Sequence, residues 1–272
     1  MNGITQGTMI SSMRSERYIG HQCYGIVISA RCDLANKKIT KVFYLIAIPL
    51  EEWILSDAGF SILLSGVVTN IEGSLKDFAK NNDLSWIDLK TFSLEEFEQV
   101  VCELQMKNRQ AKDIIHKFKK FKVYTTHKYG LREKQSIISA ERKSFEGGCM
   151  EIVSGKNLQF SYIPEDAIND IINGVVIDHQ ELDYLTISTA ELVDNYKMDV
   201  TVLTKEEQEK FNDKFFIIEE PGYSIPLCTI KSPWIEYLMQ RFSNMFTRIG
   251  VDVPQKIEIS NVIDRILAKE SD

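Results

Sequence analysis

Long apolar runs are absent from this chain of 272 residues. One of the longest, Phe43–Ile48, suits a buried strand and is far short of the roughly 20 residues that a membrane-spanning helix needs. Residues 1–20 carry charged and polar groups where a secretion signal would carry an apolar stretch. We therefore expect a cytoplasmic protein that does not contact a membrane.

Paired cysteines are also absent. The chain has five cysteines, an odd number without any C-x-x-C pair: Cys23, Cys32, Cys102, Cys149 and Cys228. In a reducing compartment such residues behave as small buried hydrophobes. His21, Cys23 and Cys32 form a grouping that a metal could use, but a zinc site needs a second pair of ligands and none follows in the sequence. We expect no metal there.

Phosphate-binding and nucleophile motifs are missing as well. The sequence has no G-x-G-x-x-G, no G-x-x-x-x-G-K-[ST] and no serine-centred nucleophile elbow. Gly147-Gly148 is too short to cradle a pyrophosphate. These absences exclude the common nucleotide-binding and serine-hydrolase sites, and we expect no cofactor.

The chain has enough apolar residues for a sizeable core. Only six prolines are present and 44% of the residues are apolar, so widespread disorder is not expected. Ile4–Ser11, Cys23–Ala30 and Lys41–Pro49 are predicted strands, the last two rich in β-branched and aromatic residues. Short links between them favour antiparallel neighbours. We predict an α+β fold with an N-terminal β-rich part, for which an SH3-like barrel is one candidate architecture, a long central amphipathic helix and a smaller C-terminal α/β part.

Three parts are predicted along the chain. Residues 1–90 form the β-rich part, residues 91–148 the long helix with a charged connector, and residues 149–272 the α/β part. Gly147-Gly148 is the strongest local break and marks the second boundary. In the last part, short predicted strands and helices alternate: strands at Leu158–Ile163, Gly174–Ile177, Tyr184–Ser188, Phe215–Glu219 and Ile225–Ile230, and helices at Pro164–Ile172, Lys205–Phe211 and Ser260–Ala268.

The long central helix is predicted to start after Ser93. Ser93 and Glu96 have the spacing of a capping box, in which each side chain meets a backbone N–H at the helix start. Apolar residues then recur at three- and four-residue steps, except where Asn108 takes one position of the stripe: Leu94, Phe97, Val101, Leu104, Ala111, Ile115 and Phe118. The pattern predicts one continuous helix over residues 94–121, packed within the monomer or, alternatively, in a coiled coil.

Positive charge is concentrated in the same region. The net charge is −7, yet residues 101–145 hold 12 Lys/Arg and only 4 Asp/Glu. A stripe beside the apolar seam comprises Arg109, Lys112, His116 and Lys120. A basic segment in an acidic protein indicates an anionic partner or a contact with the protein's own acidic part, and an ordinary solvated helix face is the remaining explanation.

Asp33 follows a predicted strand, at a place where sheets often present chemistry. Cys32 beside it could supply a nucleophile next to an acid. A reactive thiol needs a nearby base or positive charge, and on a strand the neighbouring Arg31 would face the other way. The structural alternative is that Asp33 begins the turn and Cys32 packs inside.

Glu141 and Lys143 have the spacing of a nuclease motif. Restriction-type nucleases use an upstream acidic residue and then Glu-x-Lys on a strand, so that the carboxylates hold Mg²⁺ and the lysine steadies the attacking water. Gln135–Ala140 is the candidate strand, but residues 114–132 contain no Asp or Glu. Mg²⁺ is the cofactor that this alternative requires.

Arg109 and His116 form a second nuclease candidate. HEPN-type ribonucleases place Arg and His with four to six residues between them, as a positive clamp and a proton-transfer group at an RNA phosphate. Those domains are helical bundles, whereas strand-like segments surround this helix. A surface stripe on the helix is the ordinary explanation.

The C-terminal part contains a second amphipathic helix, Trp234–Ile249. Ser232 is its expected N-cap and Pro233 its first helical residue, and Gly250 is a good stop. Trp234 and Arg241 are the candidate partner-binding residues on it.

Two stretches, Tyr24–Leu34 and Lys231–Val251, resemble a loose group of bacterial proteins of uncharacterised activity. In that group an "ISxxCD" turn lies near the start and an "SPW…QRF…RIG" helix near the end. The resemblance implies an association with mobile-element or phage-defence genes. The opening Gln6–Ile10 and Gly25–Ser29 are also similar to the first strands of the MazF/PemK ribonuclease toxins. Pro49–Trp53 lacks the polar residue which that family uses at its active site.

The predicted function is that of a non-enzymatic subunit of a bacterial multiprotein system in phage defence. It would contact a protein partner or nucleic acid through the basic helix face or the C-terminal helix. The alternative is a nuclease that acts at Glu141 and Lys143 or at Arg109 and His116.

Overall fold

The computed structural model describes residues 4–35, 41–126, 128–169, 172–186, 226–247 and 259–268. The chain forms two compact units. Unit 1 comprises residues 1–59 and 149–269, and unit 2 comprises residues 60–148 with 270–272. The predicted helix Lys205–Phe211, the strand Phe215–Glu219 and the stop at Gly250 lie outside the described residues.

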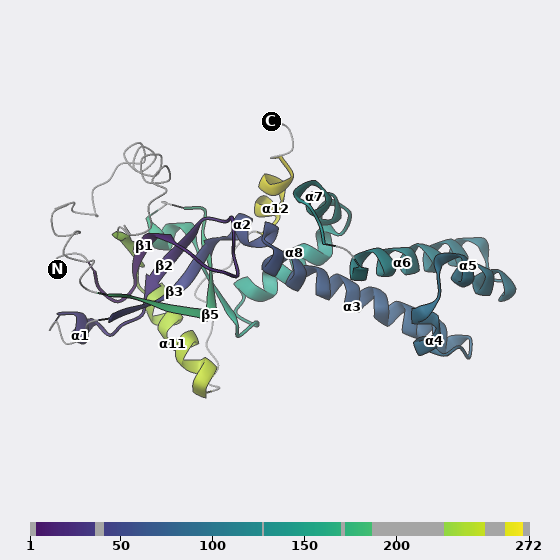
Figure 1. Cartoon of the computed structure of the whole chain (residues 1–272), viewed down its shortest axis with the longest axis horizontal. Helices are drawn as coiled ribbons and strands as arrows, with labels where there is room; N and C mark the ends of the chain where they lie inside the picture. Colours follow the sequence, from purple (N-terminus) through teal and green to yellow (C-terminus); the bar gives the residue numbers. More distant parts are fainter. Residues whose placement is uncertain are drawn as a thin grey trace. The chain divides into compact units, whose positions relative to one another are not determined.

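Unit 1 is built on a six-stranded antiparallel sheet in the order β4-β5-β3-β2-β1-β6 (Figure 1). The strands are β1 (Thr8–Met13), β2 (Cys23–Val27), β3 (Lys41–Pro49), β4 (Phe160–Ile163), β5 (Val175–Thr186) and β6 (Pro226–Thr229). The register shifts within the β1–β2, β1–β6 and β3–β5 ladders. The sheet is a half-barrel, and among the described strands no ladder joins β4 to β6.

Both faces of the sheet are covered. The helical segments of unit 1 are α1 (Arg31–Ala35), α2 (Leu50–Leu55), the 3₁₀ turn η1 (Glu165–Ile168), α11 (Trp234–Thr247) and α12 (Ile259–Ala268). The α11 side chains Trp234 and Leu238 pack into one core with Ile26, Leu45 and Ile177 of the sheet. On the opposite face, α2 places its Trp53 ring 5.2 Å from that of Phe160. The strand β3 is therefore buried on both sides, which explains its nearly unbroken apolar run.

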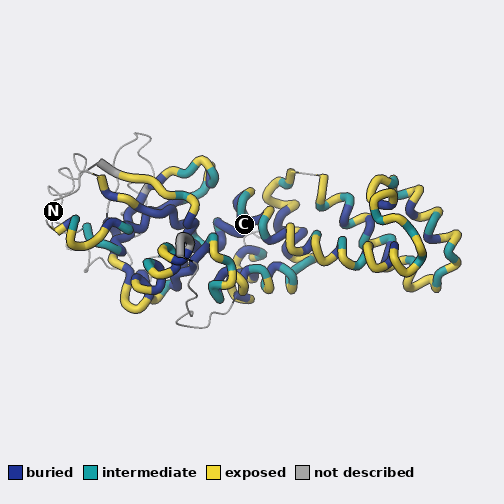
Figure 2. The backbone as a smooth tube through the Cα atoms, turned by 90° about the horizontal axis from the view of Figure 1, so that it is seen from below, coloured by how far each residue is buried: buried dark blue, intermediate teal, exposed yellow. Residues whose placement is uncertain are grey.

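Unit 2 is helical. Its helices are α3 (Asp57–Asn81), α4 (Trp86–Thr91), α5 (Leu94–Glu103), α6 (Asn108–Thr126), α7 (Leu131–Ala140) and α8 (Arg142–Val153), and the chain enters it within α3 and leaves it within α8. In α3, buried residues recur every three or four positions and form one apolar face: Phe60, Leu63, Leu64, Val67, Ile71, Leu75, Phe78 and Ala79. Figure 2 shows buried stretches alternating with exposed ones along these helices.

The helix α3 is the one described helix that is long and apolar enough to span a membrane by length and composition. Its apolar face is packed, however, since Phe78 contacts Phe97 of α5 and Phe60 contacts Phe145 of α8. Its other face exposes Ser65 and Thr69, whose hydroxyls donate to carbonyl oxygens of the same helix. The apolar face of α3 is thus a packing surface within unit 2.

These elements confirm the predicted α+β class with an N-terminal β part and a long helix. The strand Lys41–Pro49 has the predicted bounds, and the capping box is present, with Ser93 N–H donating to Glu96 Oε2 at 2.7 Å. The two predicted strands at 174–177 and 184–188 are one strand, β5.

The prediction of a single helix over residues 94–121 is wrong. The chain breaks between α5 and α6, where Gln105 has a φ of 46°. An α-helix of L-residues cannot continue through this left-handed conformation. The two helices pack against each other as a hairpin, so Phe97 and Phe118 stack with their ring centroids 4.0 Å apart. Asn108, the polar residue of the predicted apolar stripe, is the first residue of α6.

Two predictions near residue 140 are also wrong. Gln135–Ala140 is part of the helix α7 and not a strand. Gly147-Gly148 does not break the secondary structure and lies inside α8, although the two units do divide at Gly148. A Cβ atom on Gly148 would come within 2.8 Å of Leu63 Cδ2, so this glycine permits α8 to approach α3 closely.

Candidate functional site

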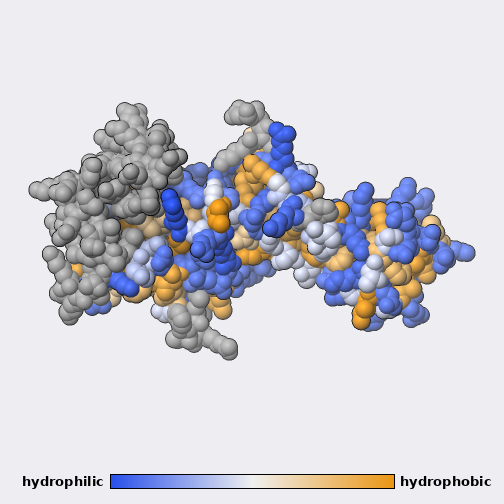
Figure 3. All heavy atoms as spheres, in the orientation of Figure 1, coloured by the Kyte–Doolittle hydropathy of each residue, from blue (hydrophilic) through white to orange (hydrophobic). Residues whose placement is uncertain are grey.

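The helix α6 carries the candidate functional surface. Arg109, Lys112, His116 and Lys119 are all exposed on it. At 100° per residue these four positions span an arc of about 80°, on the side opposite the buried residues Ile114, Phe118 and Phe121. We call these four residues the α6 basic face. Hydrophilic side chains cover much of this part of the molecule in Figure 3.

The side chains of the α6 basic face have no partners among the described residues. None of the four makes a hydrogen bond or an ion pair there. The other three lysines of the helix do: Lys117 pairs with Asp113 at 3.0 Å, Lys120 with Glu141 at 2.6 Å, and the Lys122 ammonium donates to the Lys90 carbonyl oxygen at 2.9 Å. The uncompensated positive charge of α6 is therefore concentrated on one side.

The structure modifies the predicted stripe at one position. Three of its members, Arg109, Lys112 and His116, lie on the α6 basic face. Lys120 is turned toward Glu141 and its charge is compensated. Lys119 takes its place, because the face continues from His116 by a three-residue step and not by the four-residue step of the predicted stripe.

The opposite side of α6 holds the helix in position. Phe118 stacks on Phe97 of α5, and the Phe121 ring lies 5.5 Å from that of Trp86 at the start of α4. Because α5 contacts this apolar side, it lies on the side of α6 away from the basic face. The solvent-facing side of α6 is thus fixed by packing.

Glu141 and Lys143 lie at a helix end and on a helix, and not on the strand that the nuclease motif requires. Glu141 ends α7 and accepts hydrogen bonds from Lys120 Nζ at 2.6 Å and from the Tyr124 hydroxyl at 3.1 Å. Burial raises the pKa of Tyr124, and the charge of the Glu141 carboxylate adds to this effect. Lys143 is exposed on the next helix. Among the described residues, no group of three or more His, Cys, Asp or Glu side chains could hold a metal ion.

Arg109 and His116 lie on the same exposed face of α6. They are seven residues apart on α6, which places them about 10 Å apart along the helix axis. The one acidic residue of the helix, Asp113, is paired with Lys117. The arrangement is that of a charged helix surface.

Asp33 lies in the short helix α1 and is half-buried, whereas Cys32 is exposed. The expectation that Cys32 packs inside is therefore wrong. Its thiol donates to Asp33 Oδ1 over 3.7 Å.

Trp234 and Arg241 are interior residues, so a surface role for them is wrong. Trp234 is 3% exposed and belongs to the core between α11 and the sheet. Arg241 is 4% exposed. Its guanidinium donates to the carbonyl oxygens of Gly155, Asn157 and Phe160, with the last bond 3.0 Å long. It fixes the segment that leads into β4.

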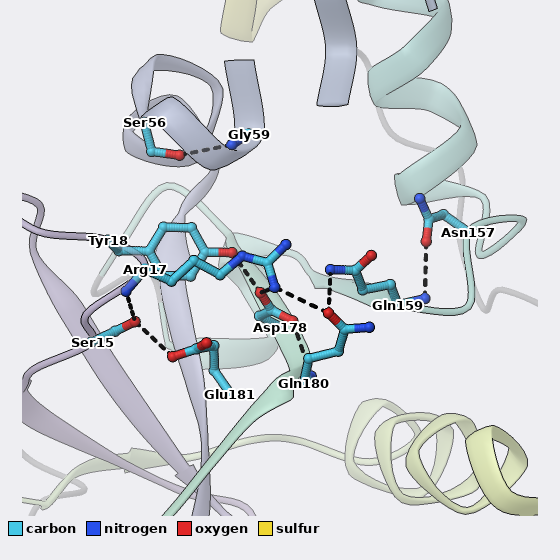
Figure 4. Close-up of polar contacts among 10 residues, drawn as sticks. All are labelled: Ser15, Arg17, Tyr18, Ser56, Gly59, Asn157, Gln159, Asp178, Gln180 and Glu181. Carbon is cyan, nitrogen blue, oxygen red and sulfur yellow. Dashed lines mark hydrogen bonds and ion pairs between the residues drawn. The ribbon is translucent and has the colours of Figure 1, made fainter. Parts of the chain in front are cut away.

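Unit 1 also contains a polar network that the sequence did not indicate (Figure 4). The Asp178 carboxylate is fully buried and accepts from the Tyr18 hydroxyl at 2.7 Å and from Arg17 at 3.2 Å. Burial raises the pKa of Asp178 despite these partners. Burial also raises the pKa of Tyr18, and the charge of Asp178 adds to this effect.

His179 is the next residue and points to the other face of the sheet. It is 3% exposed, and its Nε2 lies 2.8 Å from Ser161 Oγ. Burial lowers the pKa of His179 to about 4, assisted by Arg241, so the imidazole is neutral at pH 7. Its Nδ1 is buried without a hydrogen-bond partner among the described residues. Asp178 and His179 extend the apolar run Val175–Ile177, and two polar residues at that point were the signal that could have revealed the network.

This network is structural in its geometry. Asp178 and Ser161 are both 0% exposed, so neither can meet a substrate without a rearrangement. The α6 basic face, in contrast, is exposed and belongs to unit 2. The fold and this surface define an α+β protein with a basic helical face.

Comparisons with known proteins identify no relative of this chain. No protein-family model matches the chain, and neither the curated proteins nor the solved structures contain a significant match.

Proposed function

We propose that the protein is a non-enzymatic subunit that binds an anionic partner through the α6 basic face. The observation that carries this proposal is the difference between two sets of cations on one helix. Lys117, Lys120 and Lys122 are each engaged within unit 2. Arg109, Lys112 and Lys119 are not engaged by any described residue.

Uncompensated charges of one sign repel one another. At about 6 Å, two exposed like charges interact unfavourably by a fraction of a kcal/mol in water, and by more near a protein surface. Such a cluster does not stabilise the fold, since the stability of unit 2 comes from the apolar side of the helix. An external anion would relieve the repulsion, which makes binding the role that best accounts for the cluster.

The wider setting of this function is proposed from the resemblance of Tyr24–Leu34 and Lys231–Val251 to bacterial proteins near defence genes. The subunit would act in a multiprotein phage-defence system in the cytoplasm. Its partner would be either a protein with an acidic surface or a nucleic acid.

Retention on a polyanion resin tests the proposal. The face variant is Lys112→Gln with Lys119→Gln, and the control variant is Lys117→Gln with Lys122→Gln. Both lose two lysines from the same helix, so their net charges are equal. We expect the wild type and the control variant to be retained on heparin at low salt, and the face variant to elute at markedly lower salt.

Equal elution of the two variants would show that net charge alone governs retention, and the proposal would then be wrong. Failure of the wild type to bind the resin at 50 mM salt would contradict it as well. Matching far-UV circular dichroism spectra of the three proteins exclude unfolding as the cause of a difference.

A further inference from the structure

We infer that the partner of the α6 basic face is the phosphate backbone of a double-stranded nucleic acid. This inference rests on the proposed function and narrows its anionic partner to one class.

The face lacks the apolar centre of a protein interface. Within the arc of Arg109, Lys112, His116 and Lys119, the one exposed apolar residue is Val123, which is 40% exposed. Stable protein interfaces bury an apolar core, and each exposed ion pair adds about 0–1 kcal/mol. Three such pairs alone would give a very weak protein complex.

A polyphosphate gains energy differently. Each lysine or arginine that meets a phosphate releases a condensed counterion, so charge alone supplies affinity without apolar contact. Arg109, Lys112 and Lys119 need no rearrangement to meet phosphates, because no internal ion pair has to be broken first. Charge complementarity therefore favours a polyphosphate over an acidic protein.

The dimensions of the face fit a duplex. Arg109 and Lys119 are ten residues apart, about 15 Å along the helix axis. An α-helix with its side chains is about 10–12 Å wide, which matches the major groove of B-DNA at about 12 Å. Cations fanned over one side of the helix then reach the phosphates that line the groove.

Single strands are bound chiefly by aromatic side chains on which bases stack. The aromatic residues of α6 are not on this face. Phe118 and Phe121 are buried against α5 and α4, and the Tyr124 hydroxyl donates to Glu141. The face offers charge and no stacking surface, which favours the regular backbone of a duplex.

The acidic helix α5 does not oppose this contact. Its exposed residues include Glu95, Glu98 and Glu103. It packs on the Phe118 side of α6, opposite the basic face. A duplex on the basic face is separated from these carboxylates by the width of α6, about 10 Å, which is one Debye length at 0.1 M salt.

The test is a titration of fluorescent 24-base-pair DNA and RNA duplexes with the full-length protein at salt concentrations from 50 to 200 mM. With about three phosphate contacts, the binding constant should fall roughly 40-fold over this range for B-DNA. The face variant, Lys112→Gln with Lys119→Gln, should retain about one contact and fall only about 3- to 4-fold. The control variant, Lys117→Gln with Lys122→Gln, should behave as the wild type does. The DNA and RNA arms show which duplex is preferred.

A parallel arm uses polyglutamate of equal charge as the probe. Tighter binding of polyglutamate than of either duplex would overturn the inference in favour of an acidic protein, and the proposed function would stand. Tighter binding of single strands than of duplexes would also overturn it. Absence of duplex binding up to about 100 μM at 50 mM salt, a range that includes non-specific affinities, would overturn it irrespective of the heparin result.

Discussion

At the residue scale, unit 1 places ionisable groups where they are costly unless they have partners. Asp178 has Tyr18 and Arg17 as partners, and Arg241 has three carbonyl oxygens. His179 has Ser161 on one nitrogen and no described partner on the other. Each arrangement predicts a different response to pH or substitution.

His179 should make the protein sensitive to mild acid. Its pKa is about 4 in the fold and about 6.5 in the unfolded chain. Between these values the unfolded chain binds a proton that the folded chain does not, so the free energy of unfolding falls as the pH falls from about 6.5 to 4. Urea unfolding of the wild type and of His179→Gln, which keeps an amide for Ser161, measures this contribution.

The difference in unfolding free energy between these two proteins should depend on pH only in this window. Because both retain Asp178, whose raised pKa acts in the opposite direction, the comparison isolates the imidazole. Parallel pH profiles for the two proteins would contradict the assignment of a neutral, buried His179.

Arg241 should be essential to stability. In Arg241→Lys, the ammonium group can donate to only some of the carbonyl oxygens of Gly155, Asn157 and Phe160. The other carbonyl oxygens would be buried without a donor. We expect the free energy of unfolding to fall by about 3 kcal/mol or more, measured by urea titration. Arg132→Lys, at an exposed position of α7, is the control and should change it by less than about 0.5 kcal/mol. A similar, small loss in both variants would contradict the clamp role of Arg241.

At the element scale, two glycines of α3 should respond oppositely to the same substitution. A Cβ atom on Gly59 would lie 1.9 Å from the Trp53 carbonyl oxygen, where α2 turns into α3, whereas one on Gly73 meets nothing within 4 Å. Gly59→Ala should therefore lower the free energy of unfolding by several kcal/mol because the turn must open. Gly73→Ala should raise it by about 0.5–1 kcal/mol. Thermal unfolding of both variants checks the signs, and stabilisation by Gly59→Ala would refute the close turn.

Elements with strong local signals were predictable from the sequence. β3 has a dense apolar and β-branched run, and the start of α5 has its capping box, so both were found with correct starts. The break between α5 and α6 was not, because Leu104–Lys107 contains neither glycine nor proline. There the hairpin packing of Phe97 on Phe118 outweighs local propensity.

The candidate site was predictable only in part, for the same reason. Helical spacing placed Arg109, Lys112 and His116 on one face, since that relation is local. The engagement of Lys120 by Glu141 joins residues 21 positions apart on different helices, and the burial of Arg241 depends on carbonyl oxygens more than 80 residues away. Such contacts depend on tertiary structure and leave no periodic trace.

At the scale of the whole molecule, the sheet joins distant parts of the chain. β1 pairs with β6, and β3 pairs with β5, so unit 1 needs residues from both sides of unit 2. The fragment 1–148 should consequently lose the sheet and expose Trp53, which is fully buried in the intact protein.

Tryptophan fluorescence measures this outcome. With Trp86→Phe as the background, Trp53 is the remaining tryptophan of the fragment. Its emission should shift to the red relative to the emission of Trp53 in the intact protein. Addition of the fragment 149–272 carrying Trp234→Phe should shift it back as the strands pair. A blue-shifted emission from the fragment alone would show that the first three strands form a stable core without the rest.

Gly148 of α8 packs against Leu63 of α3, close to the points where the chain enters and leaves unit 2. Gly148 and Leu63 are in contact although 85 positions separate them, so the helical unit leaves and rejoins the sheet-bearing chain at neighbouring points. Its topology is that of an insert with adjoining ends. Replacement of this insert by another helical domain, or by a short linker, would therefore remove the α6 basic face and leave the strand connections of the sheet unchanged.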